Sequence, residues 1–177
     1  LGNVFHSAME RYSGKAEKEG GWTKIEEEKR QQLVRESLEE SIADYGNSVL
    51  YSSARNEYMI TRLDRLLNRT VWALTEQLAR GDFKPSAYEM SFGSGKIDRI
   101  DVCETQDEVY VKVIDYKTGR MGFDVSALYY GLQLQLMVYM NAATDHMKKR
   151  YPGKQVIPSG VFYYRMKDPL LEKNGKA

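Results

Sequence analysis

The sequence predicts an α/β fold in which a mainly helical first half is followed by a small mixed sheet. Two observations predict this class. Apolar residues recur at helical spacing up to about residue 80, and the period then shortens to two over three consecutive segments. Helical spacing returns near residue 124, and a last apolar run follows it. The predicted order is therefore helices, three strands, a helix and a strand.

Three helices are expected in the first half of the chain. The first covers residues 3–21 and ends at a pair of glycines. The second covers residues 22–46, where Thr23 and Glu26 have the spacing of a capping box. The third spans about residues 52–80 and carries one apolar stripe. The stripe consists of Ile60, Leu63, Leu67, Val71, Leu74 and Leu78.

The second half contains the predicted sheet. Alternating segments at residues 87–92, 96–104 and 108–116 are expected to form consecutive strands, since only short polar turns separate them. A helix over residues 124–150 and a strand over residues 156–164 complete the order. Three strands joined by short turns predict a meander.

Composition limits the class of protein. The chain has 177 residues, of which 42% are hydrophobic and 29% charged, which suits one globular domain. We expect residues 1–84 to be mainly helical and residues 85–165 to form the catalytic sheet and helix. The chain begins without an initiator methionine, so we expect a segment of a larger protein.

Charge and cysteine content exclude several function classes. A net charge of +1 gives no overall basic field, although a local basic patch is not excluded. Cys103 is the only cysteine, so neither an intrachain disulfide nor a cysteine-rich zinc site can form, which fits a reducing compartment. No run of 18 apolar residues and no signal-peptide pattern occurs. We therefore expect a cytoplasmic protein without membrane contact.

One predicted strand ends in two opposite charges. Since side chains alternate along a strand, Val109, Val111, Val113, Asp115 and Lys117 share one face. The valines indicate that this face is directed to the core, so the charges are expected at the rim of a buried surface. The stretch alone is equally compatible with an ion pair that ends a strand before a turn.

Two aspartates of the preceding strand compete for a place beside Asp115. Asp98 shares its face with Ile100 and Val102, whereas Asp101 lies on the opposite face. If the two strands form a hairpin, only one of the aspartates can lie on the face of Asp115. We expect Asp98 there, and we expect Asp101 to be an exposed charge or the partner of a neighbouring arginine.

Two converging carboxylates need a counter-ion. At 4 Å and an effective dielectric constant near 20 they would repel by about 4 kcal/mol. Lys117 offsets part of this repulsion, and a divalent cation with oxygen ligands would offset all of it. Such a site suits metal-assisted hydrolysis of a phosphodiester, in which Lys117 orients the nucleophile or stabilises developing charge.

The segments "GKID" and "VIDYKTG" resemble the motifs of the PD-(D/E)XK nucleases, in particular the RecB/AddB-type exonuclease domain. "QLMVY" is similar to the motif on the following helix of that family. "LGNVFHSAMERY" is similar to the histidine-bearing helix that precedes such domains. The resemblance runs from about residue 1 to about residue 165. It implies a restriction-endonuclease-like αβββαβ core with flanking helices.

The resemblance also implies roles for individual residues. Asp98, Asp115 and His6 would bind the metal, and Lys117 would be catalytic. Gln135 and Tyr139 would be accessory catalytic residues, and Glu89 a candidate accessory acid. The candidate DNA-binding residues that flank the site are Lys96, Arg99 and Arg120. Each has a structural alternative, such as a packed histidine for His6 or a solvated strand glutamate for Glu89.

The function implied by the resemblance is a DNA exonuclease that depends on Mg²⁺ or Mn²⁺. It would act in recombinational double-strand break repair, with DNA and a bacterial helicase subunit or helicase domain as partners. Related nucleases often hold an iron–sulfur cluster with four cysteines, and a lone Cys103 does not support such a cluster within this segment. The alternative is a catalytically silent DNA-binding or structural module with the same fold.

Overall fold

The computed structural model describes residues 2–45, 54–93, 95–117 and 133–165. Its helical section contains α1 (Gly2–Lys18), the short 3₁₀ helix η1 (Trp22–Lys24), α2 (Glu27–Asp44) and α4 (Ala54–Ala79). The strands β1 (Lys84–Phe92), β2 (Gly95–Glu104) and β3 (Glu108–Lys117) follow, and then α6 (Gln133–Arg150) and β4 (Gln155–Arg165). The predicted αβββαβ order is confirmed.

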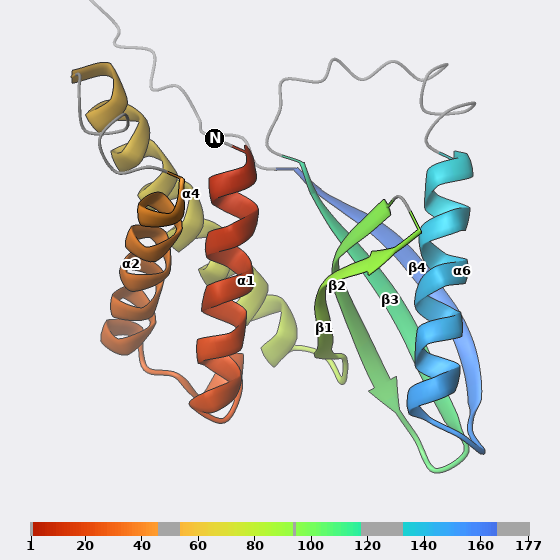
Figure 1. Cartoon of the computed structure of the whole chain (residues 1–177). Coiled ribbons are helices and arrows are strands. Elements are labelled where there is room, and N and C mark those ends of the chain that lie inside the picture. The colour runs from red at the N-terminus through yellow and green to blue at the C-terminus, as the bar shows by residue number, and fades with distance from the viewer. Residues whose placement is uncertain (1, 46–53, 94, 118–132, 166–177) are drawn as a thin grey trace, which may run out of the picture.

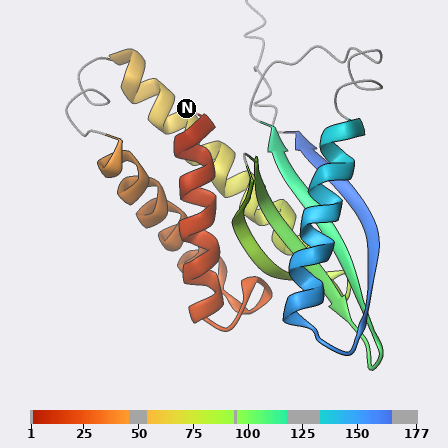
Figure 2. The ribbon, with the colours of Figure 1, turned by 45° about the vertical axis from the view of Figure 1, so that its right-hand side comes forward.

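The strands form one mixed sheet in the order β1-β2-β3-β4. β1, β2 and β3 pair antiparallel, as the predicted meander requires, whereas β3 and β4 pair parallel. A parallel pair needs a crossover connection, and α6 lies within this crossover. Figure 1 shows the helical section on one side of the sheet and α6 on the other, and the turned view in Figure 2 agrees.

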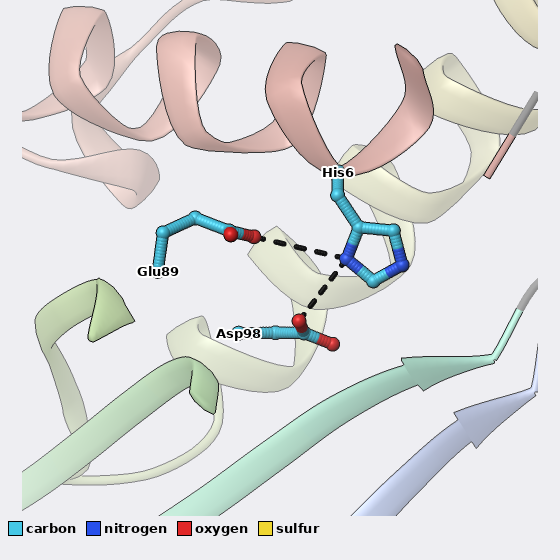
Figure 3. A group of neighbouring side chains, drawn as sticks. All are labelled: His6, Glu89 and Asp98. Atoms are coloured by element: carbon cyan, nitrogen blue, oxygen red, sulfur yellow. Dashed lines mark ion pairs between the residues drawn. The ribbon is translucent and has the colours of Figure 1, made fainter. Parts of the chain in front are cut away.

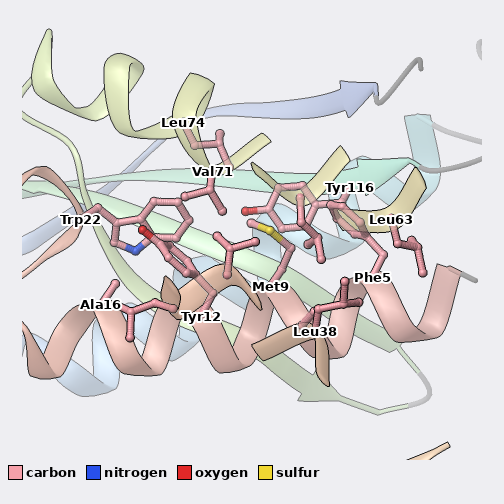
Figure 4. Packing of buried hydrophobic residues seen from close by; sticks show 14 of the residues in the cluster. Phe5, Met9, Tyr12, Ala16, Trp22, Leu38, Leu63, Val71, Leu74 and Tyr116 are labelled. Atoms are coloured by element: carbon pink, nitrogen blue, oxygen red, sulfur yellow. The ribbon is translucent and has the colours of Figure 1, made fainter. Parts of the chain in front are cut away.

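One face of the sheet packs against the helical section. Ile114 and Tyr116 of β3 join a core that contains Phe5, Met9 and Tyr12 of α1. The apolar stripe predicted for the third helix also lies in this core, as Leu63, Val71 and Leu74 illustrate in Figure 4. The helical section is therefore held to the sheet by a continuous apolar interface.

The other face packs against α6. Val109, Val111 and Val113 are fully buried there together with Ala143 and Met147 of α6. The predicted inward direction of the three valines is confirmed. Because both faces are covered, β2 and β3 are buried over most of their length, and Lys112 between two of the valines is buried too.

The predicted capping box is wrong. α2 begins at Glu27, and the N-cap residue Glu26 makes no hydrogen bond through its side chain. Thr23 lies instead in the short 3₁₀ helix, where Trp22 is buried against the Tyr12 ring at a centroid distance of 4.9 Å. Because the Trp22 indole is buried, the short 3₁₀ helix packs against the core, and α2 begins only after it.

Among the described residues, no helix combines the length and the hydropathy needed to cross a membrane.

Candidate active site

Three acidic residues face one another across neighbouring strands. The β1–β2 register pairs Tyr88 with Arg99 and Met90 with Ile97, so Glu89 lies between these two pairs and beside Asp98. The β2–β3 register ends at the pair of Arg99 with Ile114. The next residues in the same register are Asp98 and Asp115, which therefore lie opposite each other. Directly opposed side chains of paired strands lie on the same face, about 4.5–5.5 Å apart at Cβ. The register therefore aligns an acidic row, Glu89–Asp98–Asp115, across the sheet.

Glu89 has an exceptional backbone conformation for a strand residue. Its φ is 48°, and no other described residue except glycine has a positive φ. Only 7% of its side chain is exposed, so the structural alternative of a solvated strand glutamate is wrong. The left-handed conformation interrupts regular alternation, and the carboxylate is directed to the site instead of to water.

His6 of α1 lies between two of these acids. Its Nδ1 atom is 3.1 Å from Asp98 Oδ1 and 3.7 Å from Glu89 Oε1. Figure 3 shows the three side chains directed toward one another from α1, β1 and β2. One donor atom from each lies within 4.8 Å of the others. The structure thus brings His6 and Asp98 together as the resemblance implied, and it adds Glu89 to the group.

The electrostatics of this group are those of a cation site. Hydrogen bonds with Asp98 and then Glu89 raise the pKa of His6 to about 9, so His6 carries a positive charge at neutral pH. Burial alone would raise the pKa of Glu89, but hydrogen bonds from His6 and Lys96 outweigh it and lower that pKa. In the absence of metal, an imidazolium therefore neutralises part of the acidic charge.

Asp98 also fixes β2 to β3. Its second carboxylate oxygen accepts a hydrogen bond from the backbone N–H of Tyr116 at 2.6 Å. The carboxylate is only 9% exposed, and both of its oxygens have partners. Asp98 thus has a defined orientation in which one oxygen is held by backbone and the other is directed to His6.

Asp115 and Lys117 lie at the end of β3. Lys117 Nζ is 2.7 Å from Asp115 Oδ2, yet that buried oxygen has no well-aligned hydrogen bond. Burial raises the pKa of Asp115; the Lys117 hydrogen bond opposes this rise, and the charge of Asp98 adds to it. The ion pair considered from the sequence is therefore present, and the effect of Asp98 on this pKa agrees with the opposed positions of the two aspartates.

Gln135 and Tyr139 bond to each other on α6. Gln135 Nε2 donates to the Tyr139 hydroxyl at 2.7 Å, and the Tyr139 ring packs edge-on against Phe92.

Tyr163, which no sequence motif indicated, pairs with Asp115 across β3 and β4, and its ring lies 5.3 Å from Lys117 Nζ. Burial, followed by the charge of Asp115, raises the pKa of Tyr163 to about 12. A parallel register that sets two residues side by side leaves no local signal in the sequence.

Arg99 does not belong with the candidate DNA-binding residues. Its side chain is 1% exposed and donates to both oxygens of Asp101, at 2.5 and 2.8 Å. Its guanidinium lies over the Trp22 ring, and Lys112 lies 3.3 Å from Asp101. Arg99 is buried because the helical section covers this face of β2, so it cannot reach a phosphate at the surface. Asp101 is the predicted arginine partner and not an exposed charge.

The other two candidates differ in position. Lys96 forms an ion pair with Glu89 while its side chain stays 53% exposed. It can therefore contact a phosphate at the rim of the site. Arg120 lies outside the described residues.

The donor set suits a hard divalent cation. Carboxylate oxygens are the ligands that Mg²⁺ and Mn²⁺ prefer, and Mn²⁺ also accepts an imidazole nitrogen. The group combines Nδ1 of His6 with oxygens of Glu89 and Asp98. Asp115 offers a further buried carboxylate nearby, whose Oδ2 atom lies 2.7 Å from Lys117 Nζ. The residues fit the metal expected from the sequence.

Comparisons with known proteins place the chain in a family. The PD-(D/E)XK nuclease superfamily matches residues 1–177. One subunit of an ATP-dependent helicase/deoxyribonuclease from Lachnoclostridium phytofermentans is 45% identical over 98% of this chain. Proteins of the same name from Clostridium tetani and Alkaliphilus metalliredigens are 35% and 33% identical over 97% and 99% of it. This chain covers 16%, 17% and 17% of these three relatives, or about a sixth of their length.

Proposed function

Because the chain belongs to the PD-(D/E)XK nuclease superfamily, we propose that it hydrolyses DNA phosphodiester bonds as an exonuclease that depends on Mg²⁺ or Mn²⁺. The observation that carries the proposal is the acidic row across β1, β2 and β3, with His6 between Glu89 and Asp98 and Lys117 beside Asp115. A catalytically silent module would have no need to bury these acids together.

Each residue of the site has a separate task in this proposal. His6, Glu89 and Asp98 would hold the divalent cation, with Asp115 as a further ligand. The bound cation would polarise the phosphate and lower the pKa of the attacking water. Lys117, held by Asp115, would donate a hydrogen bond to the phosphate or to the nucleophile. Lys96 would bind a phosphate at the rim.

The setting of the reaction is part of the proposal. The relatives are named as subunits of an ATP-dependent helicase/deoxyribonuclease. We infer that this chain acts as one nuclease domain of such a helicase–nuclease in recombinational repair of double-strand breaks. A helicase that delivers a strand would explain how a nuclease with a net charge of +1 obtains its substrate.

Manganese is expected to stabilise the folded chain. At a hundredfold excess of free metal over its Kd, one site adds about 2.7 kcal/mol, which raises the Tm by several degrees. Thermal melts with MnCl₂ and with EDTA measure the shift. Asp98→Asn should remove it, whereas Asp107→Asn, which changes an exposed acid, should retain it. An undiminished shift in the Asp98 variant would contradict the proposed ligand set.

The isolated 177-residue chain is expected to cleave DNA weakly. Its basic and acidic residues number 26 and 25, which leaves little excess charge for non-specific DNA affinity. Labelled single-stranded and double-stranded DNA, with and without Mn²⁺, would be incubated with increasing protein. Shortened products only at high protein concentration and only with metal are the expected result. Nanomolar binding at physiological salt would contradict the need for delivery by a helicase.

A further inference from the structure

The outward face of α4 carries three basic side chains with an aromatic side chain at each end. Tyr58, Arg62, Arg65, Arg69 and Trp72 follow one another at steps of four, three, four and three residues. This spacing places all five on one side of a helix. We refer to them as the basic–aromatic stripe. At about 1.5 Å per residue, the stripe is about 21 Å long.

The stripe lies opposite the buried side of α4. Leu67, Val71 and Leu74 point into the core, with at most 1% exposed, whereas Tyr58 and Trp72 are 55% and 52% exposed. Tyr58 and Trp72 are thus large aromatic side chains that the fold does not use for packing. Their positions at the two ends of the stripe place the arginines between two exposed rings.

Neither Arg65 nor Arg69 is neutralised by a neighbour. Both are exposed, and among the described residues neither forms an ion pair. The stripe itself contains no acidic residue. By contrast, the surface arginine Arg11 is paired with acids of α2. The charges of Arg65 and Arg69 are therefore available to an anionic partner.

The middle of the stripe adjoins the end of the sheet that carries the acids. The charge of Arg69 acts on Tyr164 of β4, where burial raises the pKa and the arginine opposes the rise. The Tyr164 ring lies 6.2 Å from the Tyr116 ring, and Tyr116 follows Asp115 in β3. The charge of Arg69 therefore lies near enough to affect Tyr164, whose ring contacts the residue that follows Asp115.

We propose that the basic–aromatic stripe of α4 binds single-stranded DNA, with Arg65 and Arg69 on phosphates and Trp72 stacked on a base. The charge of Arg65 and Arg69 complements a phosphate backbone, and the exposed rings on either side of the arginines suit unpaired bases. Duplex DNA keeps its bases stacked on each other, so the rings favour a single strand. This surface lies outside the acidic row and would hold the strand beside it.

Intrinsic fluorescence can report contact at Trp72 directly. The chain has two tryptophans, and Trp22 is 3% exposed, so an added oligonucleotide reaches only Trp72. Titration of the full chain with oligo(dT) in EDTA and low salt is expected to quench the fluorescence. A duplex of the same length should quench it less, and Trp72→Phe should abolish the change.

The salt dependence of binding can report the arginines. Each phosphate contact with a single strand adds about 0.7 to the slope of log K against log salt. The double variant Arg65→Ala/Arg69→Ala is therefore expected to lower the slope by about 1.4. The matched control Arg35→Ala/Lys149→Ala removes the same charge from exposed positions on α2 and α6, and it should change the slope by less than half as much.

The outcomes separate this proposal from the proposed nuclease activity. EDTA prevents cleavage, and Asp107→Asn, which changes an exposed acid at the turn between β2 and β3, should bind oligo(dT) as the unchanged chain does. Equal slopes for the two double variants, or an unquenched Trp72, would overturn the role of the stripe and leave the nuclease assignment untouched. Sedimentation that shows self-association lost in Trp72→Ala, without quenching by DNA, would also overturn it in favour of a protein contact.

Discussion

Replacement of Asp115 by asparagine is expected to lower metal-dependent DNA cleavage by at least about a hundredfold, while the metal-free protein keeps or gains stability. The substitution preserves volume and removes a charge that is buried and opposed by Asp98. Cleavage of labelled DNA in Mn²⁺ and thermal melts in EDTA measure the two effects.

The stability gain of this variant should depend on pH. The pKa of Asp115 is raised in the folded state, so the folded chain loses stability relative to the unfolded chain as pH rises through that pKa. Asp115→Asn removes the loss, and its advantage should be full at neutral pH. Below the ordinary carboxyl pKa of about 4, the group is protonated in both states and the advantage should disappear.

Asp107→Asn serves as the matched control for Asp115, because it removes an exposed acid at the turn between β2 and β3. It should leave both cleavage and the Tm close to those of the unchanged chain. A marked loss of stability in Asp115→Asn at neutral pH would mean that the ion pair with Lys117 outweighs burial and repulsion. The acid would then be structural, and its role as a ligand would lose its support.

Replacement of Arg99 by methionine is expected to cost about 3–5 kcal/mol of unfolding free energy. The change leaves Asp101 fully buried with Lys112 at 3.3 Å, and it removes two charge-assisted hydrogen bonds. Urea unfolding followed by circular dichroism measures the loss as a lower midpoint at an unchanged slope. Cleavage per folded molecule should not change, because Arg99 cannot reach the substrate.

Arg11→Met provides the comparison for the buried pair. Arg11 bonds to Glu40 and Asp44 at the surface, where such pairs contribute about 0–1 kcal/mol. A similar small effect for Arg99→Met would show that the buried pair contributes no more than a surface pair. The helical section would then hold the sheet through apolar contacts alone.

The order of elements could be predicted because it depends on local periodicity. The change of period near residue 87 separates helices from strands, and the short turns enforce the antiparallel meander. The sequence could not reveal that the second face of β2 is buried as well. Alternation distinguishes two faces, but it does not identify a face that a distant helix covers. The burial of Arg99 and Asp101 was therefore out of reach of the sequence.

Part of the site could also be predicted from local periodicity, because side chains alternate between the two faces of a strand. The alternation of "GKID" and "VIDYK" favoured Asp98 over Asp101 as the neighbour of Asp115, and the registers agree with that choice. His6 and Asp98 are 92 positions apart in the chain, and only the family resemblance linked them before the fold did. The direction of Glu89 depends on one backbone angle that no spacing rule encodes.

The left-handed backbone at Glu89 lowers the stability of the fold, but it directs the carboxylate to the site. A non-glycine residue in this conformation costs about 1–2 kcal/mol, and the surrounding strands must supply that energy. Asparagine tolerates the conformation better than glutamate, but it has a shorter side chain and no charge. A search for more heat-resistant variants of this chain would therefore tend to select substitutions at position 89 that remove a proposed metal ligand. Thermostability alone is a misleading criterion for engineering this nuclease domain.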